Sequence, residues 1–123
     1  MASILIVSGP GEGAYCPLGK RTVIVGRDEG ATVQINDVKV SRKHLQIRLV
    51  DSGSYVALDM KSANGSRLNG EPISGEVELK DHDVLEVGTS KLAFSTTDFP
   101  DRESAINQWK KRGQRDRSTI SDA

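Results

Sequence analysis

Short apolar runs separated by turn-forming residues recur through the first 100 residues of the chain. In one of them, Leu45, Ile47 and Leu49 alternate with Gln46 and Arg48, which is the period of a strand with one solvated face. The runs occupy residues 3–8, 15–18, 21–26, 32–35, 45–49, 55–59, 84–87 and 91–95. Short strands at intervals of about ten residues, without a helical period, favour an antiparallel β-sandwich.

Turn-forming residues mark where the chain is expected to reverse. Asn64-Gly65 and Asn69-Gly70 are strong turn signals, because Asn and Gly tolerate the positive φ that tight turns require. Gly26 closes the run at 21–26, and we expect it to let the chain turn sharply as it leaves the strand. These residues predict loops at the ends of the strands.

The pattern changes after residue 100. Residues 101–112, with the sequence DRESAINQWKKR, begin with acidic residues and end with basic ones, which predicts a short C-terminal helix aligned with its own dipole. Ala105, Ile106 and Trp109 could share a narrow apolar stripe on this helix. The last residues carry no apolar pattern and predict a flexible basic tail. We therefore expect a domain over residues 1–98 and a C-terminal segment over residues 99–123.

Composition and charge narrow the classes of function. The net charge is zero, residues 1–100 carry 11 basic and 13 acidic side chains, and aromatic residues make up 4% of the chain, which argues against a nucleic-acid-binding surface. Cys16 is the only cysteine, so no intrachain disulfide can form and a reducing compartment is expected. The N-terminal run SILIV is too short for a signal peptide or a membrane span. We expect a cytoplasmic protein.

Three loop segments carry the candidate chemistry. Arg27 offers a planar fork of N–H donors suited to phosphate. Ser41 offers a hydroxyl donor, and its basic neighbours Lys39, Arg42 and Lys43 make its surroundings positive. Asn64 could pair with both the N–H and the C=O of an extended peptide. A phosphothreonine carries about −1.5 to −2 charges and three acceptor oxygens, so this set suits a phosphorylated side chain and its backbone.

An enzyme is the less favoured interpretation of the same residues. Ser41 and His44 lie three residues apart, but no orienting acid or oxyanion hole is evident, so a hydrolase is not expected. We expect His44 to be buried or half-buried, with ring nitrogens that brace its loop. Two histidines and one cysteine are too few and too scattered for a zinc site, and no cofactor is expected.

The order and spacing of these motifs resemble one known family. The run VIVGRDEGATVQINDVKVSRKHLQI, followed by SANGSRLNG, resembles the forkhead-associated (FHA) domain, whose pattern is Gly-Arg, then Ser-x-x-His, then Asn-Gly-Ser/Thr and a second Asn-Gly. The resemblance covers about residues 3–97 and depends on four motifs taken together.

The resemblance implies a β-sandwich of about eleven strands that binds phosphothreonine peptides through loops at one end. By matching position, Arg27 and Ser41 would hold the phosphate, Arg42 would assist, and Asn64 would hold the peptide backbone. The residues that would shape the loops are Gly26, His44, Gly65, Asn69 and Gly70. Ala63 stands where some members place a Thr or Ser that adds a phosphate contact, and Ser66 replaces the commoner Thr.

The expected function is therefore a phosphothreonine-peptide binding module that acts as a signalling adaptor downstream of Ser/Thr kinases. The alternative is a phosphate-independent scaffold that uses the same fold for protein–protein docking. In the tail, Arg115 and Arg117 precede Ser118 and Thr119, which is a pattern that a basophilic kinase could use, and Asp122 lies three residues after Thr119. The phosphorylated tail is therefore a candidate ligand of the domain itself.

Overall fold

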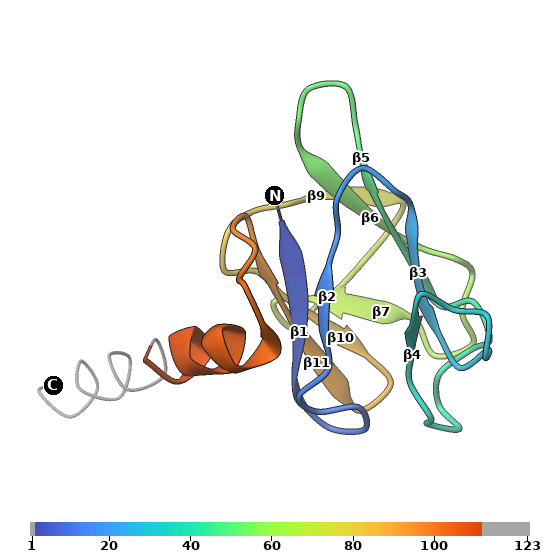
Figure 1. Ribbon diagram of the computed structural model, residues 1–123. Helices are drawn as coiled ribbons and strands as arrows, with labels where there is room; N and C mark the ends of the chain where they lie inside the picture. Colours follow the sequence, from blue (N-terminus) through green and yellow to red (C-terminus); the bar gives the residue numbers. More distant parts are fainter. Residues whose placement is uncertain (1, 112–123) are drawn as a thin grey trace, which may run out of the picture.

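The computed structural model describes residues 2–111 and contains two β-sheets packed face to face, followed by one helix at residues 102–111 (Figure 1). The strands are β1 (Ser3–Ser8), β2 (Tyr15–Pro17), β3 (Val23–Gly26), β4 (Val33–Gln34), β5 (Leu45–Leu49), β6 (Tyr55–Asp59), β7 (Ser66–Leu68), β8 (Glu71–Pro72), β9 (Glu76–Leu79), β10 (Val84–Val87) and β11 (Ser90–Ser95). The predicted β-sandwich of eleven strands with a short C-terminal helix is confirmed.

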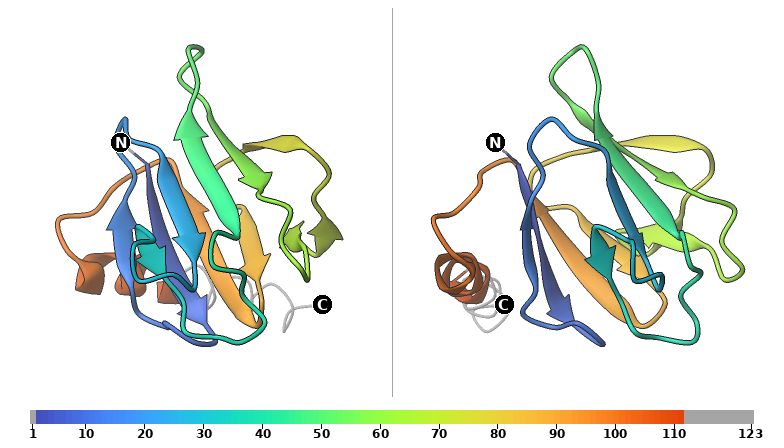
Figure 2. Two further views of the ribbon diagram at one scale, coloured as in Figure 1. Left: turned by 90° about the vertical axis from the view of Figure 1, so that its right-hand side faces the viewer. Right: turned by 45° about the vertical axis from the view of Figure 1, so that its right-hand side comes forward.

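One sheet has six strands in the order β2-β1-β11-β10-β7-β8, and the other has five in the order β4-β3-β5-β6-β9 (Figure 2). All the strand pairs are antiparallel except β3 with β4, which run parallel with Val25 opposite Val33. The parallel pair forms because residues 27–32 fold back along β3, where the Thr32 hydroxyl accepts the Ile24 N–H at 3.2 Å. This return places the loop after β3 beside the loop after β4.

The core lies between the two sheets and follows the alternation that the sequence shows. Leu45 and Ile47 on β5 are fully buried, whereas Gln46 and Arg48 between and after them are only half-buried. Two aromatic rings cross the core, Tyr55 from the five-stranded sheet and Phe94 from the six-stranded sheet, with centroids 5.9 Å apart. Such a tilted pair adds to the apolar burial that holds the two sheets together.

The helix covers the outer face of the six-stranded sheet (Figures 1 and 2). Leu5 on β1 and Ala93 on β11 lie opposite each other and line a small cavity together with Ala105 of the helix. The Ala105 residue is only 3% exposed. The Tyr15 hydroxyl accepts the Phe99 N–H at 2.7 Å and donates to the Phe99 carbonyl at 3.1 Å. The segment after β11 is thus attached to the sheet by specific hydrogen bonds as well as by apolar contact.

Three of the strands are not predicted by the pattern of apolar residues. They are β7, β8 and β9, which are two to four residues long and have charged residues at most of their exposed positions. The helix begins at residue 102, one residue later than predicted, because the Asp101 side chain accepts the Ser104 N–H at 2.8 Å as an N-cap does. The predicted helix end at residue 112 and the predicted tail lie outside the described residues.

We predict that Tyr15→Phe loosens the C-terminal helix. The change removes both hydrogen bonds to Phe99, and at a half-buried site this should lower the free energy of unfolding by about 1–2 kcal/mol. Urea denaturation measures the loss, and the fluorescence of Trp109, the only tryptophan in the chain, reports the docking of the helix. Tyr55→Phe is the matched control, because the Tyr55 hydroxyl donates to the Gly19 carbonyl at 2.7 Å, away from the helix. An equal change in Trp109 emission in both variants would contradict the prediction.

Candidate functional site

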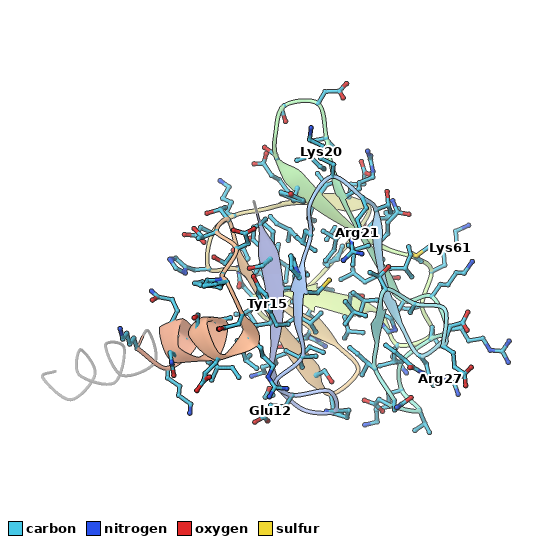
Figure 3. The ribbon with its side chains drawn as sticks, viewed as in Figure 1. Glu12, Tyr15, Lys20, Arg21, Arg27 and Lys61 are labelled. Carbon is cyan, nitrogen blue, oxygen red and sulfur yellow. The ribbon has the colours of Figure 1, made fainter. Side chains whose placement is uncertain are left out.

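The candidate residues lie on three loops at one end of the sandwich. Arg27 follows β3, Ser41 and Arg42 lie between β4 and β5, and Asn64 lies between β6 and β7. In Figure 3, Arg27 and Lys61 lie on the side of the molecule opposite the C-terminal helix. Hydrogen bonds between the loops bring residues from three parts of the sequence into one site.

Arg27 is anchored at its backbone and at one nitrogen of its side chain. Its N–H donates to the Ser41 carbonyl at 3.0 Å, and its Nε donates to the Val40 carbonyl at 3.1 Å. The side chain is otherwise exposed, and its two terminal nitrogens have no partner among the described residues. Because Nε is fixed, the free edge of the guanidinium group presents paired donors to an anion.

The Ser41 hydroxyl has a defined orientation. Its Oγ accepts the Ala63 N–H at 3.0 Å, which ties the loop before β5 to the loop before β7. A hydroxyl that accepts this bond can still donate its own hydrogen to a ligand. Ser41 is half-buried, so this hydrogen remains accessible at the surface.

The Asn64 side chain forms a second link between the same two loops. Its Nδ2 donates to the Lys39 carbonyl at 2.8 Å, and since a carbonyl can only accept, this bond identifies the nitrogen of the amide. The amide keeps its Oδ1 and a second N–H for an extended peptide. Asn64 is exposed and is followed by Gly65, whose φ is 74°, as expected for an Asn-Gly turn.

His44 lies beneath these residues and is fully buried. Its Nδ1 accepts the Ser41 N–H at 3.0 Å, so the ring hydrogen must lie on Nε2, which donates to the Gly65 carbonyl at 2.8 Å. The imidazole therefore links the loop that contains Ser41 to the loop that contains Gly65. Neither nitrogen faces the Ser41 hydroxyl, so this pair lacks the hydrogen bond that activates a serine nucleophile.

Gly26 is required for a different reason from the one that the sequence suggests. Its φ is not positive, so it does not supply a sharp turn. Instead, a Cβ at this position would collide with the Arg42 carbonyl oxygen and would lie 3.1 Å from the Ser41 carbonyl oxygen. The missing side chain therefore lets the loop that carries Ser41 and Arg42 approach β3 closely.

Asp37 and Thr89 fix the other end of this loop and were missed by the sequence analysis. The Asp37 Oδ1 accepts the Lys39 N–H at 3.0 Å, and its Oδ2 accepts the Thr89 N–H at 3.1 Å and the Thr89 hydroxyl at 2.9 Å. These bonds, the one from Lys39 first, lower the pKa of Asp37. Asn36-Asp37 is recognisable in the sequence as a turn, but nothing there indicates Thr89 as its partner.

Asn69-Gly70 forms the turn between β7 and β8, with φ values of 51° and 87°. The Asn69 Oδ1 accepts the Val84 N–H at 2.9 Å, and its Nδ2 donates to Asp83 at 2.9 Å. The second Asn-Gly pair thus holds strands of the six-stranded sheet in place.

Asp59, at the end of β6, organises the loop that carries Asn64. Its Oδ1 accepts the hydroxyls of Ser62 and Ser66, each at 2.6 Å, and its Oδ2 accepts the Ser62 N–H at 3.0 Å. Burial alone would raise the pKa of Asp59, but the hydrogen bonds from Ser62 and Ser66 outweigh this effect and lower it. Ser66 is 3% exposed and points to Asp59, so its role is structural.

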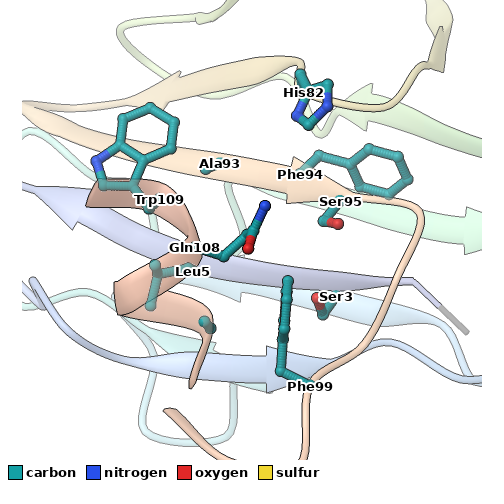
Figure 4. Close-up of a pocket in the computed structure, with 10 residues that line it drawn as sticks. Ser3, Leu5, His82, Ala93, Phe94, Ser95, Phe99, Gln108 and Trp109 are labelled. Carbon is teal, nitrogen blue, oxygen red and sulfur yellow. The ribbon is translucent and has the colours of Figure 1, made fainter. Parts of the chain in front are cut away.

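Two hollows differ in chemistry and place. One has a volume of about 270 Å³ and lies beside the three loops, where it is lined by Lys39, Asn64, Gly65, Arg67, Glu86 and Gly88. The other is an apolar cavity of about 40 Å³ beneath the C-terminal helix, bordered by Trp109, Phe99 and Leu5 (Figure 4). Only the charged hollow adjoins the candidate site. Within residues 2–111, no cluster of three His, Cys, Asp or Glu side chains could hold a metal ion, and no helix is long and apolar enough to cross a membrane.

We predict that the contribution of Asp59 to stability depends on pH. Because the folded-state pKa lies below the ordinary value of 3.8, the contribution is present above about pH 4 and is lost as the pH falls through the folded-state pKa. Asp59→Asn should therefore lower the free energy of unfolding by about 1–2 kcal/mol at pH 7. The difference in this free energy between the variant and the unaltered protein should become smaller below pH 4. Urea denaturation between pH 2.5 and 7 measures the gap.

Asp51→Asn, at the exposed turn between β5 and β6, is the matched control and should change stability little at any of these pH values. A gap for Asp59→Asn that stays constant from pH 7 to pH 2.5 would show that the carboxylate does not act through its charge.

Residues 5–98 match the family described as the cytoplasmic domain of the inner membrane component of the type III secretion system. The "oxoglutarate dehydrogenase inhibitor" of Corynebacterium diphtheriae is 37% identical over 94 residues, which are 76% of this chain and 64% of that protein. The "glycogen accumulation regulator GarA" of Mycolicibacterium smegmatis is 33% identical over 95 residues, which are 77% of this chain and 59% of that protein. The chain thus spans roughly three fifths of the length of these relatives.

Solved structures show the same fold. One FHA domain, from work on phosphothreonine-dependent FHA domain interactions, superposes with a TM-score of 0.70 at 30% identity, covering 80% of this chain and 98% of that one. The chain therefore belongs to the forkhead-associated (FHA) domain family, in which the matching type III secretion domain is an FHA-like member.

Proposed function

We propose that this protein is a phosphothreonine-peptide binding module that acts as a signalling adaptor downstream of Ser/Thr kinases. One observation carries the proposal. The free edge of the Arg27 guanidinium, the Ser41 hydroxyl and the Asn64 amide belong to loops that are hydrogen-bonded to one another, and each keeps unused hydrogen-bonding capacity at the surface. Arg42 is exposed next to Ser41 and adds positive charge.

Each residue has a separate role in the proposed complex. Arg27 and Ser41 donate to the phosphate oxygens, Arg42 assists at the phosphate or the peptide backbone, and Asn64 pairs with the backbone beside the phosphothreonine. Gly26, His44 and Gly65 hold the loops in the geometry that this requires.

The energetics suit a reversible interaction. Charge-assisted hydrogen bonds contribute about 1.5–3 kcal/mol each. Three of them, reduced by the loss of freedom on binding, are compatible with an affinity of the order of 1 μM, which corresponds to about −8 kcal/mol. Ala63 contributes only its backbone N–H at this site, so the extra hydroxyl contact that some FHA domains make is lacking.

The proposed module is not an enzyme. The imidazole of His44 is occupied by two backbone groups, and the relatives are named as an inhibitor and a regulator. We also propose that the binding module comprises residues 1–98 and acts in the cytoplasm, in keeping with its single cysteine.

We predict that a phosphothreonine peptide binds and its unphosphorylated counterpart does not. Arg27→Ala should weaken binding of the phosphopeptide by about 2–5 kcal/mol, as when one partner of a close charge pair is removed, and should leave thermal unfolding nearly unchanged. Titration calorimetry with a phosphothreonine peptide library supplies the affinities.

Arg48→Ala is the matched control, because Arg48 pairs with Glu76 on the outer face of the five-stranded sheet, away from the loops. It should bind phosphopeptides as the unaltered protein does. Equal affinity for phosphorylated and unphosphorylated peptides would support the alternative function, a phosphate-independent scaffold.

We propose a more specific ligand, the chain's own tail, in the same molecule or in a second copy. Arg115 and Arg117 precede Ser118 and Thr119 in a pattern that a basophilic Ser/Thr kinase could use, and Asp122 follows Thr119 by three residues. A tail peptide phosphorylated at Thr119 should shift amide NMR signals of the three loops, and the peptide phosphorylated at Ser118 should do so less. No shift in either titration would exclude the tail as a ligand.

A further inference from the structure

One turn, at residues 37–40, is hydrogen-bonded to two of the three side chains of the candidate site and leads directly into the third. The carbonyls of its last two residues accept the Asn64 amide at 2.8 Å and the Arg27 Nε at 3.1 Å. Ser41 is the next residue of the chain, and its carbonyl accepts the Arg27 N–H at 3.0 Å. The directions of all three donors therefore depend on where this turn lies.

Asp37 is the residue that holds the turn. Its carbonyl accepts the Val40 N–H at 2.9 Å and its Oδ1 accepts the Lys39 N–H at 3.0 Å, so it closes the turn twice. Its Oδ2 accepts the N–H and the hydroxyl of Thr89, which lies between β10 and β11 of the six-stranded sheet. The turn follows β4 of the five-stranded sheet, so one carboxylate ties it to the opposite sheet.

Gly88 allows the two turns to lie this close. Its φ is 61°, and a Cβ at this position would lie 2.7 Å from the Asp37 Oδ2 and 2.7 Å from the Val40 Cγ2. Both distances are well inside van der Waals contact. Any side chain at residue 88 would push the turns apart, so the turn between β10 and β11 is shaped to receive the carboxylate.

The charge of Asp37 is unfavourable for the proposed ligand. The hydrogen bonds from the Lys39 N–H and from Thr89 lower the pKa of Asp37, so its carboxylate is ionised at neutral pH. A negative charge in the loop that carries Ser41 repels a phosphate dianion. On charge alone, neutralising Asp37 should strengthen phosphopeptide binding. The carboxylate favours binding only if its hydrogen bonds orient the turn.

We infer that Asp37 is a positioning residue for phosphopeptide binding, which orients the donors of the site by tying the turn at residues 37–40 to Thr89. The inference rests on the proposed function and goes beyond it, because it assigns a role in affinity to two residues outside the site. A turn that is already oriented lowers the ordering cost of binding. This gain exceeds the repulsion between the carboxylate and the phosphate.

The test compares two charge-neutralising substitutions in the full chain. Asp37→Asn keeps the size and the turn-forming character of Asp, but in either orientation its NH2 group faces a backbone N–H, that of Lys39 or that of Thr89. Glu29→Gln is the matched control, because Glu29 is exposed in the loop after Arg27 and loses the same charge. Calorimetry with a phosphothreonine peptide that the unaltered protein binds gives the affinities, and thermal unfolding checks the fold.

We expect Asp37→Asn to weaken binding by about fivefold, as the loss of one hydrogen bond does, and Glu29→Gln to leave binding unchanged or to strengthen it. Thr89→Val lacks the hydroxyl and should weaken binding less than Asp37→Asn, whereas Thr89→Ser should bind as the unaltered protein does. Because Asp37→Asn and Thr89→Val disturb the same contact, together they should weaken binding by less than the product of their separate effects.

An affinity of Asp37→Asn equal to or above that of the unaltered protein would overturn the inference and leave the proposed function standing. Independent effects of Asp37→Asn and Thr89→Val would do the same. If Asp37→Asn is unfolded at the temperature of the titration, Thr89→Val decides, and an unchanged affinity of that variant overturns the inference. Failure of the unaltered protein to bind every phosphothreonine peptide would overturn the proposed function and the inference together.

Discussion

The buried imidazole of His44 is the contact on which the candidate site depends. It accepts from the Ser41 backbone and donates to the Gly65 backbone, so it fixes the separation of two loops that are more than twenty residues apart in the sequence. A buried histidine with both ring nitrogens satisfied is a rigid spacer, because a rotation of the ring would break two hydrogen bonds at once. The Ser41 hydroxyl and the Asn64 amide take their relative position from this spacer.

Other hydrogen bonds also fix the positions of these loops. Arg27 reaches the backbone of residues 40 and 41, Asp37 ties this loop to the turn before β11, and Asp59 organises the loop that bears Asn64. Most of these bonds use a backbone group on at least one side. The site is thus arranged before any ligand arrives, which reduces the ordering cost that binding must overcome. A preorganised set of donors is what recognition of a compact dianion requires.

Much of the fold could be predicted from the sequence, because alternation in residues 45–49 and 55–59 and the Asn-Gly pairs act locally. The short strands β7, β8 and β9 could not, since they are held by pairing to neighbours and not by their own apolar pattern. The loops of Arg27, Ser41 and Asn64 were predicted as the site from residue chemistry and motif order. Thr89 was missed as the partner of Asp37 because the two residues are 52 positions apart, and a hydrogen-bond partner so distant in the chain leaves no mark in a single sequence. Gly26 was singled out correctly, but steric approach and not backbone φ explains it.

The way in which the loops are joined also has a consequence for how such a module can diversify. Since the cross-links run mainly through carbonyls, amides and the buried ring of His44, outward side chains at positions 38, 42 and 63 can be exchanged without redrawing the path of the chain. New ligand preferences could then arise by single replacements on a constant frame. The same frame would tolerate few changes at position 26 or 44, where an added atom or a lost nitrogen would disturb every loop together.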